Sequence, residues 1–172
     1  MRIYGYGDQG IDDSGYGCVY RNLQSLMSLF TKSIPTIPEL QGLLDIPFSR
    51  NARRMWIEPP EAEDLFRALV PHVPTKSVIY AKHTTPRFDL YSHRNIYRDP
   101  IDFHNFLCSS PFPVLVDNGE SSYLVLECDQ GRGYIIGDPH IRDPARRIGR
   151  ITRRDFYSDP LWMGLTVFPN RS

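Results

Sequence analysis

Apolar residues near the N-terminus of the chain recur at the spacing of a helix. Val19, Leu23, Leu26 and Phe30 follow one another at i, i+4, i+7 and i+11, so a helix would present all four on one face. The helix that this pattern predicts begins close to Cys18.

Three further segments carry helical signals. Residues 59–70, PPEAEDLFRALV, have proline and acidic residues at their start and place Leu65 and Leu69 on one face. Residues 33–46, SIPTIPELQGLLDI, indicate a turn and a short helix. Residues 99–107, DPIDFHNFL, begin with an Asp–Pro pair that suits an N-cap and the first helical position.

The pattern changes in the C-terminal third of the chain. Short runs of β-branched and aromatic residues alternate there with turn signals, in PFPVLVDNG, SSYLVLECD, RGYIIGD and LWMGLTVFP. KSVIYA, residues 76–81, indicates a buried strand further upstream, and DNGESS and DQGRG predict hairpins between neighbouring strands. Helices therefore precede a largely antiparallel sheet, and the expected fold class is α+β.

Length and charge narrow the functional classes. The 172 residues suit one domain with a sizeable core, so we expect residues 1–172 to form a single domain. Lys plus Arg number 20 and Asp plus Glu number 20, which argues against a nucleic-acid or membrane-surface role. No apolar run approaches the roughly 20 residues that cross a bilayer, and MRIYGYGDQG lacks the apolar core of a secretory signal. We expect a soluble intracellular protein.

The three cysteines, Cys18, Cys108 and Cys128, are few, odd in number and far apart. Because no CxxC pair occurs, the sequence argues against a zinc ribbon and against a disulfide framework. This usage is typical of a reducing compartment.

Cys18 has a position in which a thiolate is favoured. It follows Gly15 and Gly17, where we expect the backbone to need a positive φ or a close approach to a neighbour. Near the first turn of a helix, free backbone N–H groups and the helix dipole stabilise the thiolate, which is the nucleophilic form of cysteine. Cysteine also buries readily as a small apolar residue, so this position alone leaves both catalysis and packing open.

A cysteine nucleophile needs a base, and His140 is the best candidate among the histidines. It ends the apolar strand in YIIGDPHI, and Asp138 lies two residues earlier, on the same face of an extended chain. Asp138 would then orient the imidazole as the third member of a triad. Asp–Pro pairs also occur at 99–100, 143–144 and 159–160, so an ordinary turn is an alternative. Loop, exposed or helical positions account for the other histidines: His72, His83, His93 and His104.

Taken together, GYGCVYRNLQSL and the downstream GDPH resemble the Ufm-modifier-specific cysteine proteases, a papain-like family. That family carries Gly-Trp-Gly-Cys-x-Tyr-Arg-x-Leu-Gln at a helix start and an apolar strand that runs into Asp-Pro-His. DQGIDDSGYGC is similar to its Asp-rich lead-in, and RRMWIEPPEAEDLF to its Arg-x-Trp-Ile-x-x-x-Glu segment. The resemblance covers most of residues 4–140. Autophagy cysteine proteases share a looser version of the motifs.

The chain departs from the family in two places. Tyr16 stands where the family has tryptophan, and Ser121, Ser122 and Tyr123 stand where a small residue and a histidine are expected. These departures bear on substrate preference more than on chemistry, because the triad residues are intact.

The resemblance implies a role for each matching residue. Cys18 would be the nucleophile, His140 the general base and Asp138 its orienting partner. Tyr6, twelve residues before the cysteine, would donate to the developing oxyanion together with the Cys18 backbone N–H, and Tyr4 is the second choice.

The resemblance also implies a narrow channel for a glycine-ending tail. Gly15, Tyr16 and Gly17 would bind substrate along one wall, and the DNGESSY turn at residues 117–123 would form the other wall.

An arginine-rich stretch follows the candidate base in IRDPARRIGRITRRD, residues 141–155. A solvated face is the default interpretation. A docking surface for acidic patches on a substrate and an RNA-binding surface are the alternatives, and the neutral total charge weakens the second.

These observations favour a papain-like thiol protease that cleaves after the C-terminal glycine of a ubiquitin-fold modifier. It would mature the modifier's precursor or release the modifier from target proteins. We expect a cytoplasmic monomer with the modifier and its conjugates as partners, without nucleic acid, membrane segment, metal or organic cofactor. The alternatives are a deubiquitinase or a protease for another ubiquitin-like modifier, a catalytically silent modifier-binding domain and, as the weakest, a zinc-binding structural role.

Overall fold

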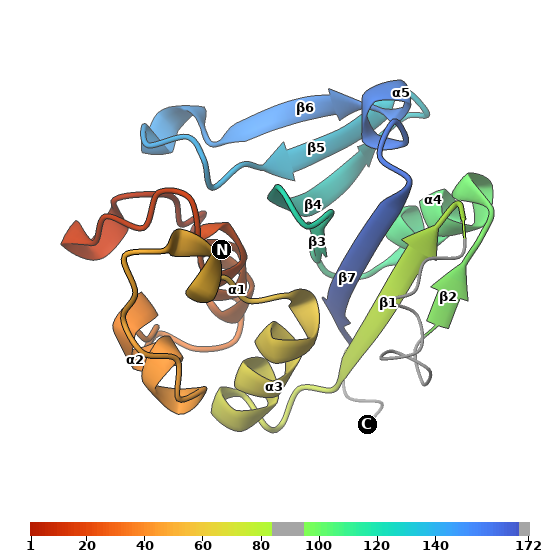
Figure 1. The fold of residues 1–172 in the computed structure, drawn as a ribbon. Coiled ribbons are helices and arrows are strands. Elements are labelled where there is room, and N and C mark those ends of the chain that lie inside the picture. Colours follow the sequence, from red (N-terminus) through yellow and green to blue (C-terminus); the bar gives the residue numbers. More distant parts are fainter. Residues whose placement is uncertain (84–94, 169–172) are drawn as a thin grey trace.

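A computed structural model describes residues 1–83 and 95–168 and places helices on both faces of a sheet (Figure 1). The predicted N-terminal helices are all present: α1 (Cys18–Met27), α2 (Ile37–Leu43) and α3 (Pro59–Leu69). Capping boxes begin two of them, because Thr36 and Glu39 cap α2 while Glu58 and Glu61 cap α3. Short 3-10 turns form at Asp8–Gly10, Ala52–Arg54 and Pro144–Arg146.

The sheet contains seven strands in the order β2-β1-β7-β3-β4-β5-β6. Their bounds are β1 Thr75–Ala81, β2 Asn95–Tyr97, β3 Val114–Asp117, β4 Ser122–Asp129, β5 Gly133–Gly137, β6 Ile148–Thr152 and β7 Leu161–Val167. Every pairing is antiparallel except that of β1 with β2. The α+β prediction and both hairpins, β3–β4 and β4–β5, are confirmed.

The topology adds features that the sequence pattern did not reveal. The C-terminal strand β7 lies between β1 and β3, so it joins the two halves of the sheet. The helix α4 (Pro100–Ser109) begins at its predicted Asp–Pro pair and follows β1 and β2, so helices do not simply precede strands. The short helix α5 (Arg153–Phe156) follows β6.

Alternating residues of the strands supply two apolar cores. Leu115 and Leu124 pack in the core that α1, α2 and α3 cover, while Val116 and Val125 pack in the core that contains Phe103 of α4. This alternation is what the period of two predicts for a sheet that is covered on both faces. The helix α1 therefore lies against the centre of the sheet, and all ten of its residues are buried.

Arg147 is the exception to the interpretation of the arginine-rich stretch as a solvated face, because Arg142, Arg146, Arg150 and Arg154 are exposed. Arg147 is 1% exposed. Its guanidinium donates to both carboxylate oxygens of Asp8, at 2.7 and 2.8 Å. It also donates to the backbone carbonyl oxygens of Ile3, Ile141 and Arg142. Residues 148–152 of the stretch form β6 at the sheet edge. One arginine of this stretch is thus an internal clamp that ties the N-terminal segment to the segment after β5.

A second buried ion pair, Asp13–Arg21, anchors the segment before α1. The Asp13 carboxylate accepts from Arg21 Nε at 2.8 Å and Nη2 at 3.0 Å, and both side chains are fully buried. Asp13 also accepts from the Gly7 and Gly17 backbone N–H groups, through its carboxylate and its carbonyl respectively. The pair therefore holds the turn that leads into Cys18.

We expect Asp13→Ala to lower the free energy of unfolding by about 3–5 kcal/mol, because it leaves the Arg21 charge buried without its partner. The matched control is Asp12→Ala. The Asp12 side chain is 82% exposed and pairs with Arg142 at 3.2 Å, and such surface pairs contribute about 0–1 kcal/mol. Denaturant titration of both variants measures the difference. Equal losses in the two variants would contradict the role of the buried pair.

The structure corrects the expectation of no disulfide. Cys108 of α4 and Cys128 of β4 form a disulfide with a Cα–Cα distance of 5.4 Å, and Cys18 is the free cysteine. Sequence spacing could not show this, because α4 packs across β4 only after the sheet has formed. Within residues 1–83 and 95–168, no helix has the length and apolar character to cross a membrane.

Candidate active site

The turn before Cys18 uses its two glycines for different reasons. Gly15 has φ +89°, a left-handed conformation that glycine adopts without strain. Gly17 has a negative φ, but a Cβ atom at this position would clash with Asp13 Oδ2. The expected positive φ and the expected close approach are both present, one at each glycine.

Cys18 is the first residue of α1 and is fully buried. Burial, and then the nearby Asp117 carboxylate, raise the pKa of its thiol to about 12, although the Tyr6 hydroxyl and the backbone of Val19 and Ser122 stabilise the thiolate. The expectation that the helix start favours a thiolate is therefore wrong for the free protein. Desolvation of the charged form outweighs the donors around the sulfur.

Asp138 and His140 follow β5 and lie in contact. The Asp138 Oδ1 atom accepts from the His140 backbone N–H at 2.9 Å and lies 2.7 Å from His140 Nδ1. The strand ends at Gly137, so the pair is joined by a tight turn rather than by alternation along an extended strand. Burial is the largest influence and opposes ionisation of Asp138, but the two hydrogen bonds from His140 and its charge together outweigh burial and hold the carboxyl pKa below its usual value. Asp138 is thus a carboxylate that fixes the imidazole orientation.

Tyr6 links the two halves of the site. Its backbone N–H donates to the Pro139 carbonyl at 2.8 Å, and its ring packs edge-on against the His140 ring with a centroid separation of 5.3 Å. Its hydroxyl lies beside Cys18 and Gly15, and burial and then Cys18 raise the phenol pKa, so the hydroxyl stays a donor. Tyr6 thereby contacts residues on both sides of the site.

Tyr4, the second choice for the oxyanion donor, and Gln9 of the 3-10 turn at Asp8–Gly10 both lie in other contacts. The Tyr4 backbone N–H donates to Ser25 Oγ, and the Arg2 guanidinium lies 4.6 Å from the Tyr4 ring centroid. Gln9 Oε1 accepts from Gln24 and Arg21. The geometry favours Tyr6 as the donor near the thiol.

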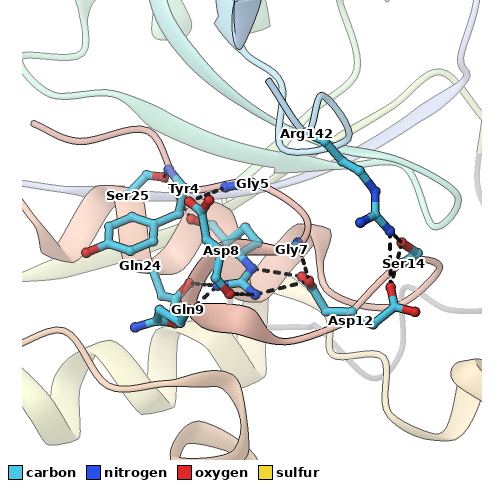
Figure 2. Close-up of polar contacts among 12 residues, drawn as sticks. Tyr4, Gly5, Gly7, Asp8, Gln9, Asp12, Ser14, Gln24, Ser25 and Arg142 are labelled. Atoms are coloured by element: carbon cyan, nitrogen blue, oxygen red, sulfur yellow. Dashed lines mark hydrogen bonds and ion pairs between the residues drawn. The ribbon is translucent and has the colours of Figure 1, made fainter. Parts of the chain in front are cut away.

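Hydrogen bonds position the segment that carries Tyr6. Figure 2 shows the Gly5 backbone N–H directed at the Asp8 carboxylate, at 3.1 Å. It also shows Arg142 reaching across to Asp12 and Ser14, which it contacts at 3.2 and 2.8 Å. With the Arg147 clamp, these contacts join the N-terminal segment to the loop that contains Asp138 and His140.

Asn22 was not predicted as functional, and Ser122 and Tyr123 were predicted only as part of the turn at residues 117–123. The Ser122 backbone lies beside Cys18, and Ser122 Oγ accepts from Asn22 Nδ2 at 2.9 Å in a buried contact between β4 and α1. The Tyr123 ring lies 5.7 Å from the His140 ring, centroid to centroid. The only signal in the sequence was the departure at residues 121–123, which identified the segment but not its contacts.

A cavity of about 680 Å³ opens beside the turn that precedes Cys18. Gly15 lines it, and Gly119 and Glu120 of the turn between β3 and β4 line it as well. The other lining residues are Arg53, Trp56, Glu58, Pro60 and Glu61. Of the three expected substrate-binding residues, Tyr16 is 7% exposed and packs on Tyr20, and Gly17 is buried against Asp13. Gly15 is the one that lines the cavity.

A thiol, an oriented imidazole and a tyrosine hydroxyl are the kinds of group that a cysteine peptidase uses. The family model described as Peptidase family C78 matches residues 1–163. The chain therefore belongs to Peptidase family C78, a family of cysteine proteases.

Individual proteins are also similar to the chain in sequence or in structure. The chain is 28% identical to human Ufm1-specific protease 2 over 156 residues, which are 80% of this chain and 31% of the relative. It is 42% identical to mouse Ufm1-specific protease 1 over 66 residues, which are 34% of this chain and 30% of the relative. The crystal structure of UfSP from C. elegans superposes with a TM-score of 0.68 at 19% identity and covers 97% of this chain and 32% of that one, which shows the shared fold. The chain spans about a third of the length of these relatives.

Proposed function

We propose that residues 1–172 form one catalytic domain of a thiol protease that acts on Ufm1, removing residues beyond its C-terminal glycine or releasing it from conjugates. One observation carries this proposal. The Tyr6 hydroxyl lies beside Cys18 while the Tyr6 ring contacts His140, which is paired with Asp138, although these residues come from segments far apart in the chain. The choice of Ufm1 as the substrate rests on the relatives described above, because both curated relatives are named Ufm1-specific proteases.

The proposed reaction uses each of these residues in one step. Asp138 holds His140 through Nδ1, so that Nε2 accepts the proton of the Cys18 thiol as the sulfur attacks the carbonyl carbon of the terminal glycine. The Tyr6 hydroxyl and the Cys18 backbone N–H donate to the oxyanion that forms. The imidazolium then protonates the leaving amine, and water hydrolyses the thioester to regenerate the thiol.

A modifier probe with a C-terminal electrophile tests the proposal. A Ufm1 probe should form one covalent adduct at Cys18, identified by mass spectrometry, and Cys18→Ala should form none. A ubiquitin probe serves as the comparison. Labelling by ubiquitin in place of Ufm1 would favour a deubiquitinase, and binding of Ufm1 without any adduct would favour a silent modifier-binding domain.

Replacing the terminal glycine of the Ufm1 tail with valine should lower kcat/KM by at least about 10²-fold, because a β-branched residue cannot enter a channel in which the backbone at Gly15 approaches the tail. Steady-state kinetics on both tails measures this effect. Binding of the two substrates to Cys18→Ala should differ little, because the folded part of the modifier is unchanged. Equal kcat/KM for the two tails would indicate a general peptidase.

Tyr6→Phe should lower kcat by about 10²–10³-fold, because removal of one oxyanion donor has this effect in other hydrolases. The ring contact with His140 does not need the hydroxyl, so the fold should remain. Tyr4→Phe is the matched control and should keep the wild-type kcat. If Tyr4→Phe lowers kcat and Tyr6→Phe does not, Tyr4 rather than Tyr6 is the oxyanion donor.

The proposal extends to the oligomeric state, the location and the partners of the protein. We propose that it acts as a monomer in the cytoplasm, with Ufm1 and its conjugates as partners and without nucleic acid. The balanced charge supports the last point, since 20 basic and 20 acidic residues give no net attraction to a polyanion.

A further inference from the structure

A cluster of metal-ligand side chains lies away from the candidate active site. His104 and Cys108 lie one turn apart on α4, and Cys128 lies on β4, at the end of that strand opposite to Ser122. One ligand atom from each of the three residues lies within 4.8 Å of the others. Two of the three cysteines of the chain thus converge with a histidine, Cys108 and His104 from α4 and Cys128 from β4.

The donor set suits zinc in particular. Thiolate sulfur and imidazole nitrogen are the donors of structural zinc sites, with Zn–S about 2.3 Å and Zn–N about 2.1 Å in tetrahedral geometry. These lengths place neighbouring ligand atoms about 3.3–3.8 Å apart, and Cys108 Sγ already lies 3.5 Å from His104 Nε2. The two sulfur atoms, which are bonded to each other here, have to separate, and the three ligand atoms, now within 4.8 Å of one another, have to settle at these spacings.

The surroundings orient the histidine as a metal site requires. The Tyr134 hydroxyl lies 2.8 Å from His104 Nδ1 and 2.9 Å from the Tyr157 hydroxyl, and Tyr134 is fully buried. A hydrogen bond at one ring nitrogen fixes the other as the ligand atom, which is the usual arrangement for metal-binding histidines. Cys108 is exposed, so an ion has a path to the cluster.

We propose that His104, Cys108 and Cys128 bind one zinc ion when the two cysteines are reduced, and that the disulfide is the alternative state of the same cluster. A cellular thiol reductant such as glutathione converts the disulfide to two thiols and is itself oxidised to a disulfide. Each thiol then loses its proton as zinc binds, so one Zn²⁺ releases two protons, and water supplies the fourth ligand. The reducing compartment that the sequence predicts favours the zinc form.

The test uses the full chain in a Cys18→Ser background, which removes the active-site thiol as a competing ligand. After reduction with a phosphine and its removal under nitrogen, Zn²⁺ is titrated against a chromophoric chelator. We expect one ion per chain, with affinity at least about 10-fold weaker in His104→Ala, Cys108→Ser and Cys128→Ser, and about 10–100-fold weaker in Tyr134→Phe. The matched control, His83→Ala, alters an exposed histidine and should bind as the parent does.

Two further measurements make the result independent of peptidase activity. Co²⁺ in place of zinc should give a thiolate charge-transfer absorption band in the reduced parent and none in Cys108→Ser. The oxidised chain, with no free thiol in this background, should bind no ion at the cluster. Circular dichroism establishes that each variant is folded. A reduced, folded parent that binds no zinc, or that binds it equally well after all three ligand substitutions, would overturn the proposal.

Discussion

Hydrolysis of a Ufm1–fluorophore substrate should fall to the background rate when Cys18 is replaced with alanine, while the modifier still binds. In the proposed reaction the Cys18 sulfur forms the covalent intermediate, so no other group on the chain can replace it. Fluorescence release measures hydrolysis, and a binding isotherm with unlabelled Ufm1 measures affinity.

A second substitution at the same position separates chemistry from folding. Cys18→Ser keeps a hydrogen-bonding group of similar size among Tyr6, Val19 and Ser122, so the buried site should stay packed. It should be as inactive as Cys18→Ala, because the neutral hydroxyl is a poorer nucleophile in a site built for sulfur. Hydrolysis well above background in either variant would exclude Cys18 as the nucleophile.

Asp138→Asn should lower kcat by about 10⁴-fold, the loss that the equivalent change produces in a serine triad. The amide cannot stabilise the imidazolium, and its N–H₂ group favours the tautomer in which Nδ1 accepts, so Nε2 no longer acts as the base. Steady-state kinetics should show the loss in kcat, and the affinity for Ufm1 should be unchanged.

The control for this variant is Asp143→Asn. Asp143 is exposed, lies five residues further along the same loop and caps the turn at Pro144–Arg146 through the Ala145 N–H. It loses the same charge, and asparagine is an equally good cap, so activity should be unchanged. If the two variants are equally active, another residue orients His140.

The sequence predicted the local elements well because each has its own signal. The helix at Cys18 follows from its apolar spacing, α4 from its Asp–Pro start, and the hairpins from Asn–Gly and Gln–Gly turns. The edge strands β2 and β6 were missed: β2 has three residues, and β6 lies within an arginine-rich stretch whose residues alternate between exposed and half-buried positions.

What remained unpredicted depends on contacts between distant segments. Arg147 looks like any other arginine of its stretch, and only the fold brings Asp8 to it. The disulfide between Cys108 and Cys128 likewise depends on the packing of α4 across β4. The site residues were identified through the family resemblance, since spacing alone left Cys18 and the Asp138–His140 pair open to ordinary explanations.

The burial of Cys18 has a consequence for the durability of the protein in an oxidising cell. Burial raises the pKa of the Cys18 thiol, so the neutral form predominates at pH 7 in the resting protein. Peroxides oxidise thiolates rather than thiols, and they do so where the sulfur is accessible. The resting protein therefore keeps its sulfur in a form that hydrogen peroxide attacks slowly, and it should retain activity through an oxidative burst that inactivates enzymes with an exposed, ionised cysteine.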